Sequence, residues 1–233
     1  RPVLVEKGKP VNALEAEDFS ITEVMTAVEI NSLDLVRDEP NHIIMVMDAS
    51  GSMAGENMNA AREAASRFVQ TLERGDRVAV ISFTREIRRE IDFTDQREDA
   101  RNAIEKIQAV PNSDTCLYDA IYEALQRLAI EPEGRRAVVV LTDGVDETIN
   151  GSGCSIHTLD DVTNLAATGR TRAPIYTIGL TNRSDERNLE RMSALSGGRY
   201  RLSPTRDDLE DTFDALTEQF RNEYVLKYTS TNT

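Results

Sequence analysis

Residues 43–53 read Ile43-Ile44-Met45-Val46-Met47-Asp48-Ala49-Ser50-Gly51-Ser52-Met53. A short apolar run that is closed at once by an acid, two hydroxyls and a glycine is typical of a buried parallel strand that ends in a loop. Open α/β sheets bind ligands at the carboxyl ends of such strands. Asp48, Ser50 and Ser52 lie two residues apart, so a turn that glycine permits can direct all three side chains toward one point. A carboxylate with two hydroxyls suits a hard cation such as Mg²⁺, which prefers oxygen ligands.

The rest of the chain alternates between strand and helix patterns. Apolar runs at 78–83, 137–141 and 175–180 predict strands. Further along the chain from each of these strands, apolar residues recur at helical spacing and predict a helix. This alternation predicts a doubly wound, mostly parallel, Rossmann-like α/β sheet with helices on both faces. Residues 86–92 follow the second strand too closely for a crossover, so we expect a hairpin and one antiparallel edge strand. Asp95 with Glu98 three residues later predicts a capping box at the start of the next helix.

The two ends of the chain differ from its centre. Residues 1–40 read as short strands separated by turns, and residues 223–228 read as one more strand. We therefore expect a β extension at 1–40, a main domain at 41–221, and a C-terminal strand within 222–233 that pairs with the N-terminal extension.

The pattern Asp-x-Ser-x-Ser at a strand end resembles the metal-ion-dependent adhesion site of von Willebrand factor A domains. That family completes the site with a threonine from a second loop and an aspartate from a third. The matching positions here are Thr115, after Asn112-Ser113-Asp114, and Asp143, after Val138-Val139-Val140-Leu141-Thr142. The resemblance implies a metal site made of Asp48, Ser50, Ser52, Thr115 and Asp143, in which Asp48 and Asp143 bind directly or through water.

The resemblance also implies a function. It predicts a protein-binding or adhesion module that presents Mg²⁺, or Mn²⁺ or Ca²⁺, to an Asp or Glu carboxylate of a partner protein. The segment around Gly8-Lys9-Pro10-Val11 resembles the one that precedes the A domain in bacterial proteins of the A-domain-related class, which favours an extracellular, cell-surface or periplasmic setting. The alternative is an intracellular assembly module of the kind that partners chelatase or ATPase subunits. Because the chain begins at Arg1 without a signal peptide, we expect a fragment whose start does not reveal its localisation.

Enzymatic readings fit the residues less well, and we expect no catalytic activity. Phosphoaspartate enzymes of the haloacid dehalogenase type carry a second acid two residues after the first, where this chain has Ser50. The stretch 51–55 fails the Gly-x-Ser-x-Gly pattern of hydrolases, and only His42 and His157 are available as an imidazole base. Neither glycine-rich nucleotide-binding pattern occurs.

Composition restricts the partners further. The chain has 233 residues and a formal net charge of −14, which opposes attraction to nucleic acids and to anionic lipid. No apolar run approaches the roughly 18 residues that span a bilayer, so we expect no membrane insertion.

Two smaller features leave alternatives open. Cys116 and Cys154 each follow a predicted site loop, so they are either a disulfide or two buried thiols. The tripeptide at 74–76, Arg-Gly-Asp, spells an integrin-binding motif, but a turn before a buried strand needs the same residues. We interpret it as a turn in which Gly75 caps the preceding helix.

Overall fold

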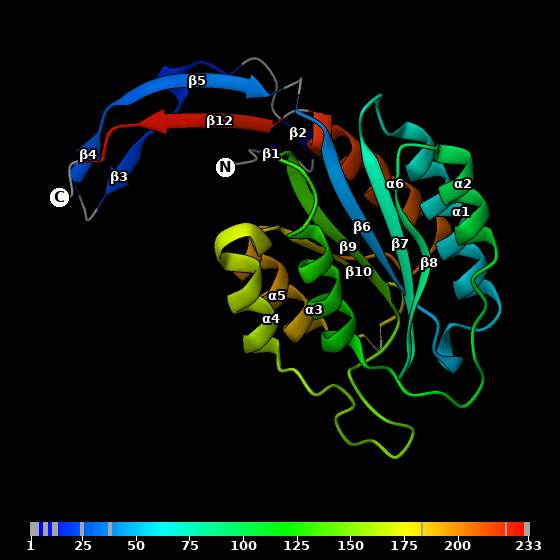
Figure 1. The fold of residues 1–233 in the computed structure, drawn as a ribbon. Helices are drawn as coiled ribbons and strands as arrows, with labels where there is room; N and C mark the ends of the chain where they lie inside the picture. The colour runs from blue at the N-terminus through cyan, green and yellow to red at the C-terminus, as the bar shows by residue number, and fades with distance from the viewer. Residues whose placement is uncertain are drawn as a thin grey trace. The chain divides into compact units, whose positions relative to one another are not determined.

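The main part of the molecule is built on a six-stranded sheet whose strands lie in the order β11-β10-β9-β6-β7-β8 (Figure 1). These strands are β6 (Asn41–Asp48), β7 (Arg77–Phe83), β8 (Ile87–Thr94), β9 (Arg135–Thr142), β10 (Ile175–Gly179) and β11 (Tyr200–Leu202). All neighbouring pairs are parallel except β7 and β8, which form an antiparallel edge. The predicted doubly wound, mostly parallel fold with one antiparallel edge strand is thus confirmed.

The computed structural model describes residues 5–6, 9–10, 14–23, 26–36, 39–182, 184–221 and 223–230. The chain divides into two compact units, Pro40–Phe213 and a second unit made of Arg1–Glu39 with Asp214–Thr233. The division falls inside the last helix, which the sequence places wholly in the main domain.

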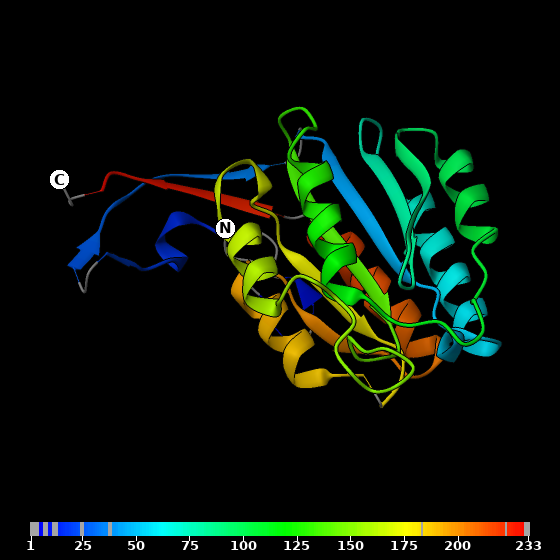
Figure 2. The same ribbon diagram turned by 60° about the horizontal axis from the view of Figure 1, so that its bottom comes forward.

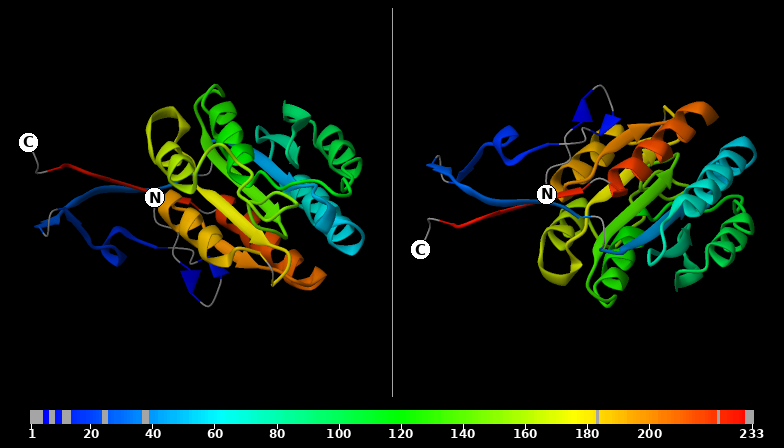
Figure 3. Two further views of the ribbon diagram at one scale, coloured as in Figure 1. Left: turned by 90° about the horizontal axis from the view of Figure 1, so that it is seen from below. Right: turned by 90° about the horizontal axis from the view of Figure 1, so that it is seen from above.

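Helices cover both faces of the sheet, and Figures 2 and 3 show these layers from further sides. They are α1 (Glu56–Thr71), α2 (Arg97–Glu105), α3 (Leu117–Leu128), α4 (Leu159–Ala167), α5 (Glu186–Ser196) and α6 (Arg206–Arg221). Apolar side chains of α3, α4 and α5 form one core with Ile44 and Val46 of β6. Met45 alternates with them and is also fully buried, so it faces the opposite layer. In that layer α1 meets α6 through the rings of Phe68 and Phe213, whose centroids lie 5.2 Å apart.

The central strand β6 explains the position of the candidate site. All eight of its residues are buried, because it lies between β9 and β7 and is covered on both sides. The chain leaves β6 toward β7 and later returns to β9 on the other side, so the strand order reverses here. Such a reversal opens a crevice at the carboxyl end of the sheet.

Two local predictions are wrong. Helix α1 ends at Thr71 with Leu72 as its C-cap, and Gly75, at φ 97°, lies in the turn that follows instead of capping the helix. The predicted capping box of Asp95 does not form, since α2 begins at Arg97 with Gln96 as its N-cap. The hydroxyl of Thr94 instead accepts a hydrogen bond from the Gln96 backbone N–H (3.0 Å), which closes a turn at the end of β8.

Besides a 3₁₀ helix at Ala16–Asp18 and the end of α6, the second unit contains antiparallel strand pairs. They are β1 (Val5–Glu6) with β2 (Lys9–Pro10), β3 (Ile21–Glu23) with β4 (Thr26–Val28), and β5 (Ile30–Val36) with β12 (Glu223–Tyr228). The β5–β12 pair joins segments from the two ends of the chain. Residues 1–4, 7–8, 11–13, 24–25, 37–38, 222 and 231–233 of the two expected end segments lie outside the described residues, and they include Gly8 and Val11 of the stretch Gly8-Lys9-Pro10-Val11.

Candidate functional site

Asp48 occupies the last position of β6 and is the most enclosed of the predicted site residues. Its side chain is completely buried. Its Oδ1 accepts a hydrogen bond from the Ser50 backbone N–H (2.8 Å), and its Oδ2 accepts one from the Thr142 hydroxyl (2.6 Å). Burial raises the pKa of Asp48 to about 6; the two hydrogen bonds oppose this rise and the charge of Asp143 adds to it. A buried carboxylate of this kind is stabilised by a cation placed beside it.

Ser50 and Ser52 connect this first loop to Asp143. Their hydroxyl oxygens lie 3.0 Å apart, and the Ser52 hydroxyl donates to Asp143 Oδ1 at 2.8 Å. The other oxygen, Oδ2, accepts a hydrogen bond from the Asn57 amide at 3.3 Å. Ser50 and Asp143 are almost fully buried, whereas Ser52 is exposed. The structure thus joins residues of two predicted loops, 91 positions apart in sequence, through side-chain oxygen atoms.

Thr115 lies on the second loop and is held beside the third. Its backbone N–H donates to the Glu147 carbonyl (2.9 Å), and its carbonyl accepts from the Glu147 N–H (3.1 Å). Its hydroxyl oxygen lies 4.0 Å from the point where a Cβ at Gly144 would stand. Thr115 therefore lies close to Gly144, the residue that follows Asp143.

Gly51 allows the first two loops to pack closely. A Cβ at this position would lie 3.1 Å from the Asn112 backbone nitrogen and 3.4 Å from the Val110 carbonyl oxygen. The Val110 N–H in turn donates to the Ala49 carbonyl at 2.8 Å. A larger residue at 51 would push the threonine-bearing loop away from the serines.

The predicted residues offer the oxygen atoms that a hard cation binds. Ser50, Ser52 and Thr115 line one pocket of about 370 Å³ at the carboxyl edge of the sheet, and the loops that carry them lie together at the bottom of Figure 1. Two carboxylates and three hydroxyls are ligands of the type that Mg²⁺, Mn²⁺ and Ca²⁺ prefer. Within the described part of the chain, no group of three or more His, Cys, Asp and Glu side chains is arranged to hold a metal. A cation here would therefore depend on hydroxyl ligands.

Two residues that hold the site were not predicted from the sequence. Thr142 donates to Asp48, and Asn57, in the first turn of α1, donates to Asp143. The first had a signal, because a hydroxyl at the end of a neighbouring parallel strand reaches the same edge of the sheet. For Asn57 the sequence offers none.

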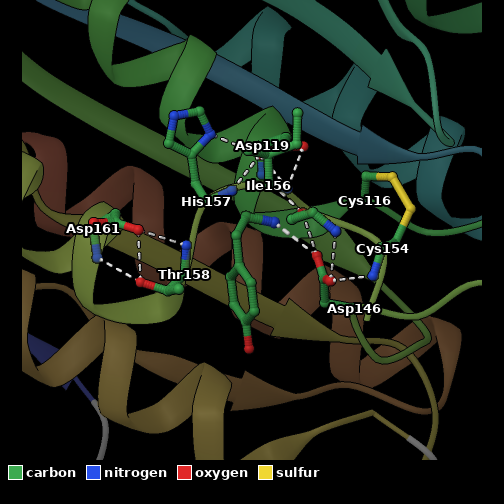
Figure 4. A network of polar contacts seen from close by, with 10 residues as sticks. Cys116, Asp119, Asp146, Cys154, Ile156, His157, Thr158 and Asp161 are labelled. Atoms are coloured by element: carbon green, nitrogen blue, oxygen red, sulfur yellow. Dashed lines mark hydrogen bonds and ion pairs between the residues drawn. A yellow bond between two sulfur atoms is a disulfide. The ribbon is translucent and has the colours of Figure 1, made fainter. Parts of the chain in front are cut away.

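The loop at 144–158 is fastened to the start of α3 beside the site (Figure 4). A disulfide joins Cys116 and Cys154, whose Cα atoms lie 4.9 Å apart. The Asp146 carboxylate accepts hydrogen bonds from the backbone N–H groups of Tyr118 (3.2 Å), Cys154 (3.0 Å) and Ser155 (2.9 Å) and from the Ser155 hydroxyl. The loop is thus anchored at its base.

A second carboxylate anchors the end of this loop. Asp119 accepts hydrogen bonds from the backbone N–H groups of Ile156 and His157, and His157 Nδ1 lies 2.7 Å from Asp119 Oδ1. The His157 ring also stacks on Tyr122, with centroids 3.7 Å apart. Burial acts to raise the pKa of Asp119, but the hydrogen bonds from Ile156 and His157 outweigh it and lower the pKa.

The Arg-Gly-Asp tripeptide at 74–76 serves the fold. Asp76 is only 7% exposed. Its carboxylate accepts hydrogen bonds from the Asn41 backbone N–H (2.7 Å), the Asn41 amide (2.9 Å) and the Glu73 backbone N–H (2.8 Å). A carboxylate with three internal donors is not available to a partner, which agrees with the interpretation as a turn.

The fold and the site together place this protein among doubly wound α/β domains whose loops gather oxygen-bearing side chains at the carboxyl edge of the sheet. The sequence model of the von Willebrand factor type A domain matches residues 42–215, and the chain belongs to this family. Domains of this family typically mediate protein–protein interaction or adhesion.

Relatives with known sequences cover different shares of the chain. Calcium-activated chloride channel regulator 1 of Homo sapiens is 28% identical over 158 residues, which are 62% of this chain and 17% of that protein. Uncharacterized protein sll0103 of Synechocystis sp. is 25% identical over 204 residues, which are 86% of this chain and 46% of that protein. The chain therefore spans less than half the length of either relative.

Solved structures agree on the architecture. A von Willebrand factor type A protein from Catenulispora acidiphila superposes with a TM-score of 0.66 at 21% identity, over 78% of this chain and 43% of that one. The PilB minor pilin from Streptococcus sanguinis superposes with a TM-score of 0.64 at 14% identity, over 81% and 63%. At these identities the similarity shows the fold alone.

Proposed function

We propose that this chain is a metal-dependent protein-binding module. A divalent cation, Mg²⁺ or else Mn²⁺ or Ca²⁺, is held by Asp48, Ser50, Ser52, Thr115 and Asp143. The cation keeps one coordination position for an Asp or Glu carboxylate of a partner protein.

The buried carboxylate of Asp48 carries this proposal. Its raised pKa means that burial disfavours its charge, and no basic side chain is among the groups that shift it. A divalent cation supplies the missing positive charge, and the hydroxyls of Ser50, Ser52 and Thr115 supply neutral oxygen ligands. Because those hydroxyls carry no charge, Asp48 and Asp143 are the only charged ligands in the proposed set, and a carboxylate of a partner can replace water at the open coordination position.

We further propose that the module has no catalytic role. Neither histidine is placed as a base for a serine of the site. His42 lies near the beginning of β6, at the edge opposite Asp48, with Nδ1 3.7 Å from a Glu131 oxygen. His157 is held by Asp119 and the ring of Tyr122.

An exported setting belongs to the same proposal. The disulfide between Cys116 and Cys154 fits an oxidising compartment such as a cell surface or the periplasm. In the described residues, no helix has the length and apolar character needed to cross a bilayer.

Calorimetric titration of the chelator-treated chain with Mg²⁺, Mn²⁺ and Ca²⁺ tests the proposal. We expect one site that is lost in Asp48→Asn, because the substitution keeps the size of the side chain and removes its charge. The matched control is Asp99→Asn, which removes the same charge from the first turn of α2. Val78, at the start of β7, pairs with Ile43 near the start of β6 and with Thr94 at the end of β8. Helix α2, which follows β8, therefore begins near the amino end of β6, whereas Asp48 stands at its carboxyl end.

Circular dichroism shows whether each variant is folded. Equal binding by the wild type and by Asp48→Asn would place the cation elsewhere. A folded wild type that binds none of the three cations would contradict the proposal.

A further inference from the structure

A small projecting turn stands at the rim of the pocket. Within the loop at 144–158, the Thr148 N–H donates to the Ser152 carbonyl (2.7 Å), and the Gly151 N–H donates to the Thr148 carbonyl (2.8 Å). The hydroxyls of Thr148 and Ser152 lie 2.8 Å apart. These contacts close residues 148–152 into a turn of their own, which we name the rim turn.

The rim turn presents a large apolar side chain to solvent. Ile149 is 67% exposed and lines the same pocket as Ser50, Ser52 and Thr115. An exposed isoleucine by itself needs no explanation. This one differs because it adjoins the opening through which a partner's carboxylate would reach the cation.

The backbone of Ile149 is fixed. Its N–H donates to Asp114 Oδ1 at 2.7 Å. Asp114 Oδ2 accepts a hydrogen bond from Arg85 Nε at 2.6 Å, so one carboxylate ties the rim turn to the β7–β8 hairpin. Asp114 also directly precedes Thr115. A partner that packs on Ile149 therefore meets a preformed surface, which reduces the loss of conformational entropy on binding.

Charge restricts what fits beside Ile149. Glu147 is the one charged residue that lines the pocket among the described residues, and its side chain is exposed. The chain as a whole carries a net charge of −14. A single acid can enter because the cation attracts it, but a second acid next to it would meet Glu147 and be repelled. The pocket and its rim thus favour one carboxylate with apolar neighbours over an acidic stretch.

We propose that Ile149 is the specificity-determining half of a composite partner site, which takes a protein segment bearing one Asp or Glu next to a large apolar side chain. This inference rests on the proposed function, since the acid must be held by the cation. The apolar side chain packs on Ile149 while the acid enters the pocket between the serines and Thr115.

Binding of synthetic peptides tests the inference. Two capped peptides on the same Gly-Ser background, one with Leu on both sides of a single Asp and one with Ser on both sides, are immobilised at equal density and titrated with the chain in Mg²⁺. We expect the Leu-flanked peptide to bind about tenfold more tightly, which corresponds to partial burial of one isoleucine against leucine. Ile149→Ser should remove this preference and leave the calorimetric Mg²⁺ titration unchanged.

Ile156→Ser is the matched control. Ile156 belongs to the same loop and is 89% exposed, but it does not line the pocket. It should keep the full preference for the Leu-flanked peptide. Equal Mg²⁺-dependent binding of both peptides, or equal loss in both variants, would overturn this inference and leave the proposed function standing. Binding that persists unchanged in chelator, or no Mg²⁺-dependent binding to either peptide, would overturn both.

Discussion

Removal of the disulfide should strongly destabilise the chain. Cys116 and Cys154 are separated by 38 positions. A cross-link over a loop of this length lowers the conformational entropy of the unfolded chain, which raises the free energy of unfolding by about 4 kcal/mol at 25 °C. The double substitution Cys116→Ala with Cys154→Ala should lower the free energy of unfolding by up to that amount. For a chain of this size, this corresponds to a fall in melting temperature of roughly 8–16 °C.

Equilibrium unfolding in urea, followed by circular dichroism, measures the effect. The unfolded state is less compact without the cross-link, so the urea dependence of the unfolding free energy should become steeper. Wild type treated with a dithiol reductant serves as the control and should follow the curve of the double variant. A loss below about 1 kcal/mol, or two titratable thiols in the denatured, unreduced wild type, would refute the reasoning.

Two further predictions concern stability. Gly198→Ala should lower the free energy of unfolding, measured in urea, by at least about 3 kcal/mol, because the new Cβ would lie 2.0 Å from the carbonyl oxygen of Ile175. Gly153→Ala is the control and should have little effect, since nothing lies within 4 Å of its Cβ. Similar losses of unfolding free energy in the two variants would contradict the packing described. The pKa of Asp119 is lower in the folded chain than in the unfolded chain, where it is about 3.9. The hydrogen bonds of the Asp119 carboxylate therefore stabilise the fold fully above that pH, and this stabilisation is lost as the pH falls through the folded-state pKa. Melting temperatures of the wild type and Asp119→Asn should therefore differ at pH 7 and converge toward pH 3, and a difference that does not depend on pH would count against this assignment.

Much of the fold was predictable because it depends on local patterns. The buried run of β6 and the short connection after β7 were enough to predict a parallel centre and an antiparallel edge. Asp48 and Asp143 reach the same edge because they stand at the carboxyl ends of β6 and β9, which are neighbouring parallel strands. Thr115 has no such reason to be there, since its loop follows α2 and leads into α3. The resemblance to a known family supplied the identity of the residues.

Other features depend on contacts that have no sequence signal. Asp95 and Glu98 have the spacing of a capping box, but Thr94 closes the chain into a turn and moves the helix start to Arg97. The role of Asp114 was not foreseen either, because Asp114 meets Arg85 and Ile149 only after three separate loops have folded. Loop geometry of this kind is set by tertiary packing and not by local propensity.

The location of the bound cation is the most direct test of the central claim. Mn²⁺ is paramagnetic and broadens the NMR signals of nearby amides, so its titration into the ¹⁵N-labelled, chelator-treated chain reports where it binds. We predict that the amides of Ser52, Thr115 and Gly144 broaden first, together with that of Asp48, and that those near Asp99 are unaffected at equal Mn²⁺. Simultaneous broadening around Asp99 and other exposed acids, with no preference for the site loops, would contradict the account.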